Sequence, residues 1–428
     1  MANEINLVSL GDTKIQFIDG DRGKNYPQKT DFYKNGYCVF LNTGNVKSDG
    51  FDFSDLNYIT QEKDEILNKG KVQLNDIVLT TRGTVGNVAI FDEQVPFKEI
   101  RINSGMVIIR CSNRFYPYFL YSFFRSSLFK SQCGLNGSGS VQPQLPISAI
   151  KNIKIPEFNL KTQQSIAAVL SALDKKIALN KQINARLEEM AKTLYDYWFV
   201  QFDFPDANGK PYKSSGGEMV FDETLKREIP KGWEVKSLGE VISLERGVTY
   251  SKDSICNDEN GTGVLRATNI SGNNIDLNDL IYISGEVDTQ QKLKPFDILI
   301  VMSSGSKEHI GKNGVYYFEQ DNAFGAFCSK ITPQKVFFEF VSIFLQSNNF
   351  RNYVKNQCLG TNINNLNNSH ILHCPIVRPN DEYIEAFHRQ TKLIYEKISC
   401  NVKQNYHLTQ LRDFLLPMLM NGQVSVAE

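Results

Sequence analysis

The stretch NTGNVKSDGFDFSDLNYIT, from Asn42 to Thr60, occurs a second time as ATNISGNNIDLNDLIYIS, from Ala267 to Ser284. Shorter matches follow in the same order, such as Ser9-Leu10-Gly11 with Ser237-Leu238-Gly239 and Asp76-Ile77 with Asp297-Ile298. The offset between partners is roughly 221–228 residues, about half the chain and far longer than the roughly 20–50 residues of a solenoid repeat. The sequence therefore predicts a duplicated domain.

Composition indicates a folded protein with several cores. The chain has 428 residues, of which 41% are hydrophobic and 11% aromatic, and eight are cysteines. Its length allows two to four domains. No apolar run approaches the roughly 20 residues of a membrane helix, and the first residues lack the pattern of a signal peptide. We therefore expect a cytoplasmic protein. Because no two cysteines form a CxxC pair, we expect reduced thiols.

The charge is balanced overall but unevenly placed. There are 47 Lys and Arg residues against 47 Asp and Glu residues. From Arg101 to Leu160 the basic residues outnumber a single acid, Glu157, and the matching part of the second copy, Asn322 to Asn380, is similar with Glu339. A basic zone at the same place in both copies predicts a surface that faces phosphates. Ordinary surface charge is the alternative.

Each copy begins with a mixed α and β part. Runs such as DIVLTTRG and GMVIIRC in the first copy, and DILIVMSSG in the second, predict short strands with turn residues between them. The stretches YFLYSFFRSSLFKSQC and FEFVSIFLQSNNFRNYVKNQC have helical spacing. The predicted class is α+β, with two similar domains of mixed α and β structure separated by two long helices that form a coiled coil.

The second part of each copy is a long helix. Apolar residues recur at steps of four and three from Thr162 toward Phe199, with Ile166 and Leu170 among the first, and at matching positions in the second copy. The same two steps are polar in both helices: Asn180 and Asn184 in the first, Asn401 and Asn405 in the second. Asparagine at a helix seam specifies register. The matched pairs favour packing of the helices on each other over two independent amphipathic helices.

The domain boundaries follow from these patterns. The stretch from Asp203 to Gly232 is polar and rich in Pro and Gly, which predicts a surface linker. We expect a first domain at 1–160, a central helix at 161–202, a linker at 203–232, a second domain at 233–380 and a C-terminal helix at 381–428.

Three stretches carry a resemblance to a known family. IPKGWEVKSLGEVISLERG, from Ile229 to Gly247, resembles the opening of a target-recognition domain in the specificity subunits of type I restriction–modification systems. The stretch from Lys161 to Phe202 is similar to the central helix of that family, and LTQLRDFLLPMLMNGQV, from Leu408 to Val424, to its C-terminal helix. The resemblance covers the whole chain, with the elements in the family's order.

The resemblance implies a function and partners. Each recognition domain would read one half of a bipartite site on double-stranded DNA, and the two helices would pack antiparallel. The chain would join two adenine-N6 methyltransferase subunits and, optionally, two restriction subunits. The resemblance implies no cofactor in this chain, S-adenosylmethionine in the methyltransferase subunits, and ATP and Mg²⁺ in the restriction subunits. One feature departs from the family pattern, because the second copy has no arginine at the place of Arg82.

The motifs of catalysis are missing from the sequence. There is neither an Asn/Asp-Pro-Pro-aromatic clamp nor a glycine-rich cofactor turn, so a fused methyltransferase is disfavoured. Asp206, Glu234 and Lys236 only loosely match a metal-nuclease pattern. His370, His373 and Cys374 lack a second cluster of zinc ligands. We therefore expect a non-catalytic subunit, with a nuclease or methyltransferase carrying tandem readers as the main alternative and a protein-binding scaffold as another.

Residues that could read bases lie in predicted loops. Arg, Lys, Asn and Gln can present paired hydrogen-bonding groups to base edges in the major groove. Two equivalent loops, SGSVQPQLP at 138–146 and GTNINNLNN at 360–368, precede the long helices and are rich in such groups. Turn chemistry is the alternative for each residue. The candidates are Arg82, Thr84, Arg101, Ser140, Gln142 and Gln144 in the first copy, and Arg246, Lys307, Lys312, Asn362, Asn364 and Asn365 in the second.

Overall fold

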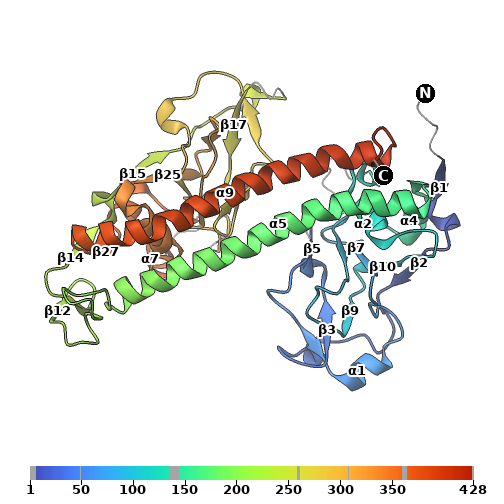
Figure 1. Cartoon of the computed structure of the whole chain (residues 1–428), viewed down its shortest axis with the longest axis horizontal. Coiled ribbons are helices and arrows are strands. Elements are labelled where there is room, and N and C mark those ends of the chain that lie inside the picture. The colour runs from blue at the N-terminus through green and yellow to red at the C-terminus, as the bar shows by residue number, and fades with distance from the viewer. Residues whose placement is uncertain are drawn as a thin grey trace. The chain divides into compact units, whose positions relative to one another are not determined.

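The chain divides into two compact units. The computed structural model describes residues 6–48, 50–134, 144–257, 261–306, 308–358 and 364–426. The first unit is Met1–Ala178 with Tyr406–Glu428, and the second is Leu179–Asn405. Each unit therefore combines one mixed α and β part with segments of both long helices (Figure 1). Within the described ranges, no helix is both long and apolar enough to cross a membrane.

The first unit contains two small sheets. One has the antiparallel order β2-β10-β7-β8 and the other the order β6-β3-β9, in which β3 and β9 are parallel. A ribbon of β1 and β11 and a hairpin of β4 and β5 complete the strands. Their bounds are β1 (Leu7–Ser9), β2 (Gln16–Asp19), β3 (Cys38–Leu41), β4 (Val46–Lys47), β5 (Gly50–Phe51), β6 (Tyr58–Ile59), β7 (Ile77–Thr80), β8 (Val88–Ile90), β9 (Ile100–Ile102), β10 (Met106–Arg110) and β11 (Lys154–Pro156).

The second unit repeats this arrangement. Its sheets have the orders β15-β25-β21-β23 and β16-β20-β17-β24, with β17 and β24 parallel. Its ribbon is β14 with β27, and its hairpin is β18 with β19. Their bounds are β14 (Glu234–Ser237), β15 (Ile242–Arg246), β16 (Ile255–Cys256), β17 (Thr262–Leu265), β18 (Ile270–Ser271), β19 (Asn274–Ile275), β20 (Ile281–Ile283), β21 (Ile298–Val301), β23 (Asn313–Val315), β24 (Ala323–Phe324), β25 (Cys328–Pro333) and β27 (Pro375–Arg378).

The shared topology confirms the duplication. Short helices also correspond, because Ser126 and Ser347 cap matching helices and accept from the backbone N–H of Phe129 and Phe350, each at 3.2 Å. Two strand pairs have no counterpart among the described residues of the first unit, namely β12 (Met219–Asp222) with β13 (Arg227–Pro230) and β22 (Ser303–Ser304) with β26 (Asn364–Asn365). A third pair, β16 with β20, has only an isolated bridge between Tyr33 and Tyr58 in its place. The short helices are α1 (Gln61–Ile66), α2 (Pro117–Arg125), α3 (Ser127–Gln132) and α4 (Ile147–Asn152) in the first unit, and α6 (Phe338–Gln346), α7 (Asn348–Gln357) and α8 (Asn368–Leu372) in the second.

A buried asparagine makes the same hydrogen bonds in both copies of the repeated stretch. The Nδ2 group of Asn45 donates to the carbonyl oxygens of Asp52 and Asp55, at 3.0 and 2.9 Å. Asn269 does the same for Asp276 and Asp279, both at 3.0 Å. Both asparagines are buried. Each one satisfies two carbonyl oxygens of the segment that follows it, so this segment and the asparagine are needed together.

The central strands are apolar on both faces because each face is covered. In β10, Val107 and Ile109 pack with α2 and α3, whereas Met106 and Ile108 pack with the second sheet. Alternate residues of a strand point to opposite faces, so a strand between two layers becomes a continuous apolar run. The runs DIVLTTRG and GMVIIRC are therefore correctly predicted as strands.

The two long helices pair within each unit. They are α5 (Leu160–Tyr195), followed by a π-helical turn to Val200, and α9 (Asp381–Met420). In the first unit, Asp174 of α5 forms an ion pair with Arg412 of α9 at 3.0 Å. In the second, Asn180 Nδ2 donates to Asn405 Oδ1 at 2.9 Å. The partner numbers fall along α9 as they rise along α5, so the pairing is antiparallel.

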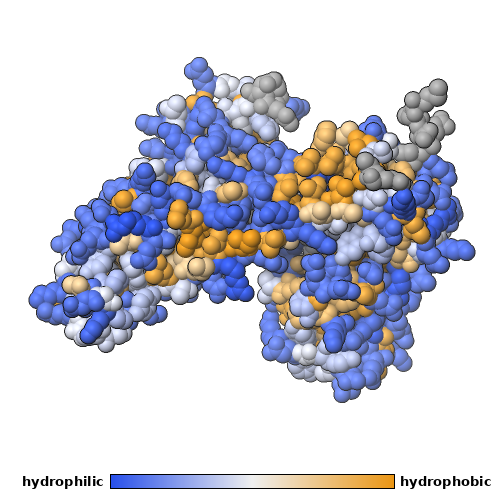
Figure 2. All heavy atoms as spheres, viewed as in Figure 1, coloured by the Kyte–Doolittle hydropathy of each residue, from blue (hydrophilic) through white to orange (hydrophobic). Residues whose placement is uncertain are grey.

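The seam asparagines meet as predicted. Asn401 Nδ2 donates to Asn184 Oδ1 at 2.8 Å, and Asn180 also donates to Gln404 Oε1 at 2.7 Å. Asn180, Asn184 and Asn401 are buried. The outer faces of the helices carry exposed apolar side chains, and Figure 2 shows such side chains gathered over them. They include Leu179, Met190, Leu393, Leu411 and Phe414.

The stretch expected to be a surface linker is folded into the second unit. Phe204 is buried and stacks on Trp233, with ring centroids 4.6 Å apart, and on Tyr212 at 4.7 Å. The hairpin of β12 and β13 follows. The Pro and Gly residues that predicted a linker serve the turns of this packed segment, so composition alone gave a misleading picture here.

Candidate nucleic-acid interface

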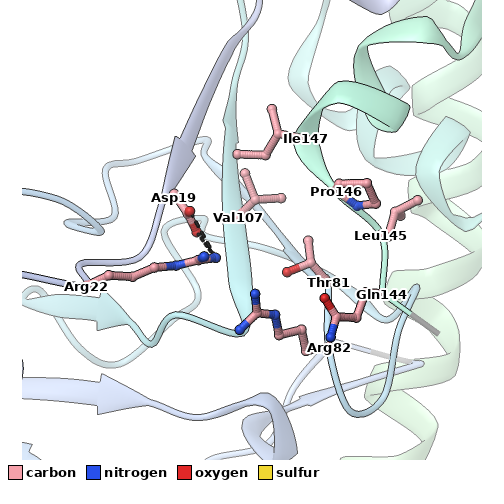
Figure 3. A pocket seen from close by; sticks show the side chains of 9 residues that line it. All are labelled: Asp19, Arg22, Thr81, Arg82, Val107, Gln144, Leu145, Pro146 and Ile147. Atoms are coloured by element: carbon pink, nitrogen blue, oxygen red, sulfur yellow. Dashed lines mark hydrogen bonds and ion pairs between the residues drawn. The ribbon is translucent and has the colours of Figure 1, made fainter. Parts of the chain in front are cut away.

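Arg82 and Gln144 come together in the first unit at one end of the four-stranded sheet. Arg82 follows β7, and Gln144 precedes α4. The backbone N–H of Leu145 donates to the carbonyl oxygen of Thr81 at 3.0 Å, which holds the two segments side by side. Both side chains line one pocket (Figure 3). The full lining is Asp19, Arg22, Thr81, Arg82, Val107, Gln144, Leu145, Pro146 and Ile147.

The hydrogen-bonding groups of this pair are available to a partner. Arg82 and Gln144 are exposed. Neither side chain makes a hydrogen bond or an ion pair with another residue that the structure describes. Across the pocket, Arg22 pairs with Asp19 at 3.0 Å and donates to the carbonyl oxygen of Ser104 at 3.3 Å. Arg22 is not among the residues predicted from the sequence, because no pattern marks one exposed arginine among many.

The same backbone frame occurs in the second unit with other side chains. The N–H groups of Thr81 and Arg82 both donate to the carbonyl oxygen of Gly105, at 2.8 and 3.1 Å. The N–H groups of Met302 and Ser303 donate to that of Phe327, at 2.8 and 3.2 Å. Ser303 therefore occupies the place of Arg82. The expectation that the second copy has no arginine there is confirmed.

Two more positions correspond by the same reasoning. Leu366 N–H donates to Met302 at 2.8 Å, as Leu145 N–H donates to Thr81, so Asn365 takes the place of Gln144. Arg246 of β15 lies opposite Ser329 of β25, and Asp19 of β2 lies opposite Val107 of β10. Because Ser329 and Val107 are equivalent positions, Arg246 takes the place of Asp19. Ser303 Oγ donates to Asn365 Oδ1. The frame is therefore conserved between units, while the side chains it presents differ.

Arg101 does not belong to this surface, which corrects the sequence analysis. Its side chain is buried, and its Nε donates to Asp64 Oδ1 at 2.5 Å. Its other nitrogens donate to the carbonyl oxygens of Lys69 at 2.7 Å, Asp64 at 2.7 Å and Leu67 at 3.0 Å. A guanidinium engaged in this way cannot reach a base. It stabilises the loop from Asp64 to Lys69, which is more than 30 residues away in the sequence.

Several cations of the predicted basic zones are paired with carboxylates. Arg110 pairs with Asp76 at 2.7 Å, Arg125 with Asp174 at 2.6 Å, and Arg114 with Glu157. In the second copy, Lys330 is buried beside Asp297, 4.0 Å away. Apart from Glu157, these carboxylates lie outside the zones. The paired cations are therefore engaged within the protein and do not support the prediction that they face phosphates.

The remaining candidates lie at scattered positions. Thr84 is exposed, and its Oγ1 donates to the carbonyl oxygen of Thr43 at 3.2 Å. Arg246 is exposed at the end of β15, and Lys312 is half-buried just before β23. Asn364 pairs through its backbone with Ser304. Ser140, Gln142, Lys307 and Asn362 lie outside the described residues.

The groups considered as metal ligands have other contacts. His370 Nδ1 accepts from the backbone N–H of Asn367 at 3.4 Å, and His373 Nδ1 lies 2.8 Å from the carbonyl oxygen of Ser369. Burial raises the pKa of the Cys374 thiol to about 12. In the part of the chain that the structure describes, no three His, Cys, Asp or Glu side chains converge as metal ligands would.

Comparison with known proteins identifies the family. The family model of the type I restriction–modification DNA-specificity domain matches residues 14–189 and 230–401. Because these two matches cover most of the chain, it belongs to this family. It is a specificity subunit with two DNA-recognition domains, a non-catalytic subunit that binds DNA and assembles with other subunits of the complex. The predicted family is confirmed.

Individual relatives agree. The specificity subunit of the MjaIX enzyme from Methanocaldococcus jannaschii is 29% identical over 355 residues, covering 82% of this chain and 78% of the relative. The EcoKI specificity subunit of Escherichia coli is 36% identical over 143 residues, 32% of this chain and 31% of the relative. The crystal structure of a type I S subunit from M. genitalium has the same fold, with a TM-score of 0.50 and 15% identity over 98% of this chain and 97% of that one.

Proposed function

We propose that each unit reads one half of a bipartite, asymmetric DNA site, and that the surface around Arg82 and Gln144 makes base contacts in the first half. The observation that carries the proposal is the shared frame. The same backbone hydrogen bonds present Arg82 with Gln144 in one unit and Ser303 with Asn365 in the other. One scaffold with different side chains is what two readers of different sequences need.

The chemistry of these side chains supports base readout. Arginine can donate two hydrogen bonds to the O6 and N7 atoms of guanine, and glutamine or asparagine can pair with adenine. Arg22 and Arg246 would lie near the sugar–phosphate backbone, where cations position a protein without reading sequence. Thr84, Lys312, Asn364 and Asn365, with Ser140, Gln142, Lys307 and Asn362 outside the described residues, remain proposed contacts.

We further propose that the paired helices set the gap between half-sites. The complex would hold two adenine-N6 methyltransferase subunits, which use S-adenosylmethionine, and optionally two restriction subunits, which use ATP and Mg²⁺, and would act in the cytoplasm. In the buried helix seam, Asn184 and Asn401 bind each other. Such buried polar pairs fix one register. A fixed register would give a fixed distance between readers.

Methylome sequencing tests the proposal. Cells with and without the gene are compared, and the modified motif that depends on the gene is read directly. Arg82→Ala and Gln144→Ala should relax one or two positions of a single half, because a base contact contributes about 1–3 kcal/mol. Lys312→Ala should affect only the other half. Arg186→Ala is a matched control, since Arg186 is exposed on α5 and pairs with Glu189 three residues away.

The outcomes separate the alternatives. A bipartite motif whose halves respond to different variants supports two independent readers. The two-reader proposal fails if Arg82→Ala alters both halves, or if no motif depends on the gene. A fused enzyme would instead require that the purified chain alone methylate or cleave DNA when given S-adenosylmethionine or Mg²⁺.

A further inference from the structure

Phe327 is an exposed aromatic side chain at the centre of the second unit's proposed reading surface. Its side chain is 68% exposed, the second largest value among the exposed large apolar residues of the described chain. It lies in the short turn between β24 and β25. A single exposed apolar residue needs no explanation by itself. Its position is what distinguishes this one, because it corresponds to Gly105, next to the place of Arg82.

The backbone of this turn is held on both sides. Gly325 N–H donates to Leu265 at 2.8 Å, and Cys328 N–H donates back to Gly325 at 2.8 Å. The carbonyl oxygen of Phe327 accepts from both Met302 and Ser303. The ring is therefore attached to a fixed support. A side chain on a fixed support loses less conformational freedom when a partner covers it.

The first unit has no room for a side chain at this place unless Thr43 shifts. A Cβ atom on Gly105 would lie 2.8 Å from Thr43 Cγ2 and 3.2 Å from Asn103 Oδ1. There the long side chain of the neighbouring residue, Arg82, extends from the frame toward a partner. In the second unit the neighbour is the short Ser303, and the side chain of Phe327 extends from the frame instead. The two units thus present a guanidinium and an apolar ring from adjacent points of one frame.

We propose that Phe327 is a specificity-determining residue that contacts the 5-methyl group of a thymine in the second half-site. This inference rests on the proposed function. The thymine methyl is the apolar group on base edges in the major groove, and phenylalanine is among the side chains suited to contact it. Ser303 and Asn365, which hydrogen-bond to each other beside it, leave the ring as the apolar element of this surface.

The test uses the chain assembled with its modification subunits. Methylome sequencing first defines the second half-site. Duplexes carrying that site are then made with each thymine in turn replaced by deoxyuridine, which lacks the methyl group. Binding is measured by fluorescence anisotropy for the wild type, Phe327→Ala and Phe327→Leu. Phe221→Ala is the matched control, because Phe221 is 55% exposed on β12 of the same unit.

One thymine should be coupled to Phe327. Replacing that thymine by deoxyuridine should weaken wild-type binding about three- to tenfold, as loss of one buried methyl contact implies. Phe327→Ala should weaken binding to the thymine duplex by a similar factor and should show no further loss on the deoxyuridine duplex. Phe327→Leu should recover part of the affinity, and Phe221→Ala should match the wild type on both duplexes.

Other results would overturn the inference. If Phe327→Ala binds and methylates like the wild type, the ring touches no base, although the proposed function stands. If it weakens thymine and deoxyuridine duplexes equally at every position, the ring acts as a wedge or a support and does not read the methyl. If the wild-type complex recognises no bipartite motif, the proposed function itself fails.

Discussion

Asn184 and Asn401 bind each other through their side-chain amides in the buried seam between α5 and α9, with Asn401 Nδ2 donating to Asn184 Oδ1 at 2.8 Å. Asn184 Nδ2 also lies 3.5 Å from the carbonyl oxygen of Ile398. A buried amide with its partner removed is left with unsatisfied groups, whereas removal of both partners leaves none. This asymmetry leads to the first prediction.

Asn401→Leu alone should destabilise the second unit by about 1–3 kcal/mol, because it leaves the Asn184 amide buried without this partner. The double change Asn184→Leu with Asn401→Leu should recover most of that loss. Chemical denaturation of the two single variants and the double variant measures the coupling. Equal and additive losses would show that the amides do not interact energetically.

The helices should act as the ruler for the gap in the DNA site. Asp174 contacts Arg412, and Asn180 contacts Asn405. A position after Leu179 in α5 therefore lies opposite a position after Asn405 in α9, and four residues inserted at each place keep the helices in register. The double insertion adds about 6 Å. The gap should lengthen by one or two base pairs at about 3.4 Å each. Methylome sequencing reads the gap.

The single insertions are the controls for the ruler. Each one puts the two helices out of register, so either the asparagine pairs or the Asp174–Arg412 pair must break, and we expect a loss of modification larger than in the double insertion. The sequence of each half-site should stay the same in the double insertion, because its reading surface is untouched. Full modification with an unchanged gap in the double insertion would rule out the helices as the ruler.

Arg101 should matter for stability and not for specificity. Burial acts to raise the pKa of the Asp64 carboxyl, but hydrogen bonds from Lys71 and Arg101 outweigh it, and the pKa is lowered. Arg101→Met removes the larger part of the hydrogen bonds around Asp64 and should lower the free energy of unfolding by roughly 3–5 kcal/mol. Thermal unfolding measures the loss. The modified motif should be unchanged at a temperature where the variant stays folded.

Lys34→Met is the control for Arg101→Met. Lys34 pairs with Asp55 on the surface, where the two side chains are 78% and 83% exposed, so its loss should be within about 0.5 kcal/mol. A stable Arg101→Met variant with an altered first half-site would return Arg101 to the set of reading residues.

Glu188 should make the second unit more stable at acid pH than at neutral pH. Burial raises the pKa of its carboxyl. A hydrogen bond from Asn273 Nδ2 at 3.2 Å acts to lower the pKa, but the effect of burial is larger. Because the folded pKa is above the unfolded one, the stabilising contribution is full below the unfolded pKa and is lost as pH rises through the folded pKa. Glu188→Gln should therefore gain up to about 1 kcal/mol at pH 7–8.

The gain from Glu188→Gln should vanish near pH 4, where both the folded and the unfolded carboxyl are largely protonated. Unfolding curves from pH 4 to pH 8 measure it. Glu189→Gln is the control, since the Glu189 side chain is 65% exposed and pairs with Arg186 on the surface. A gain that is the same at every pH would show that the buried charge is not its cause.

The sequence by itself determined the duplication, the strands and the seam of the long helices. These features are periodic or local. An apolar run between two layers, a Ser that caps a helix, or an Asn at a seam position depends on neighbours a few residues away or on a repeat. The resemblance of three stretches to one family was enough to predict the family that the comparison confirmed.

The tertiary structure alone decided which polar side chains are free. Three cations of the first basic zone, Arg101, Arg110 and Arg125, meet carboxylates 34 to 49 residues away in sequence, and no local pattern marks such partners. Arg82 and Gln144 meet only because the backbone joins Leu145 to Thr81. Phe327 corresponds to Gly105 through backbone hydrogen bonds, which do not depend on the side chain. Exposure and charge compensation are properties of contacts between distant segments, so folding had to place those segments first.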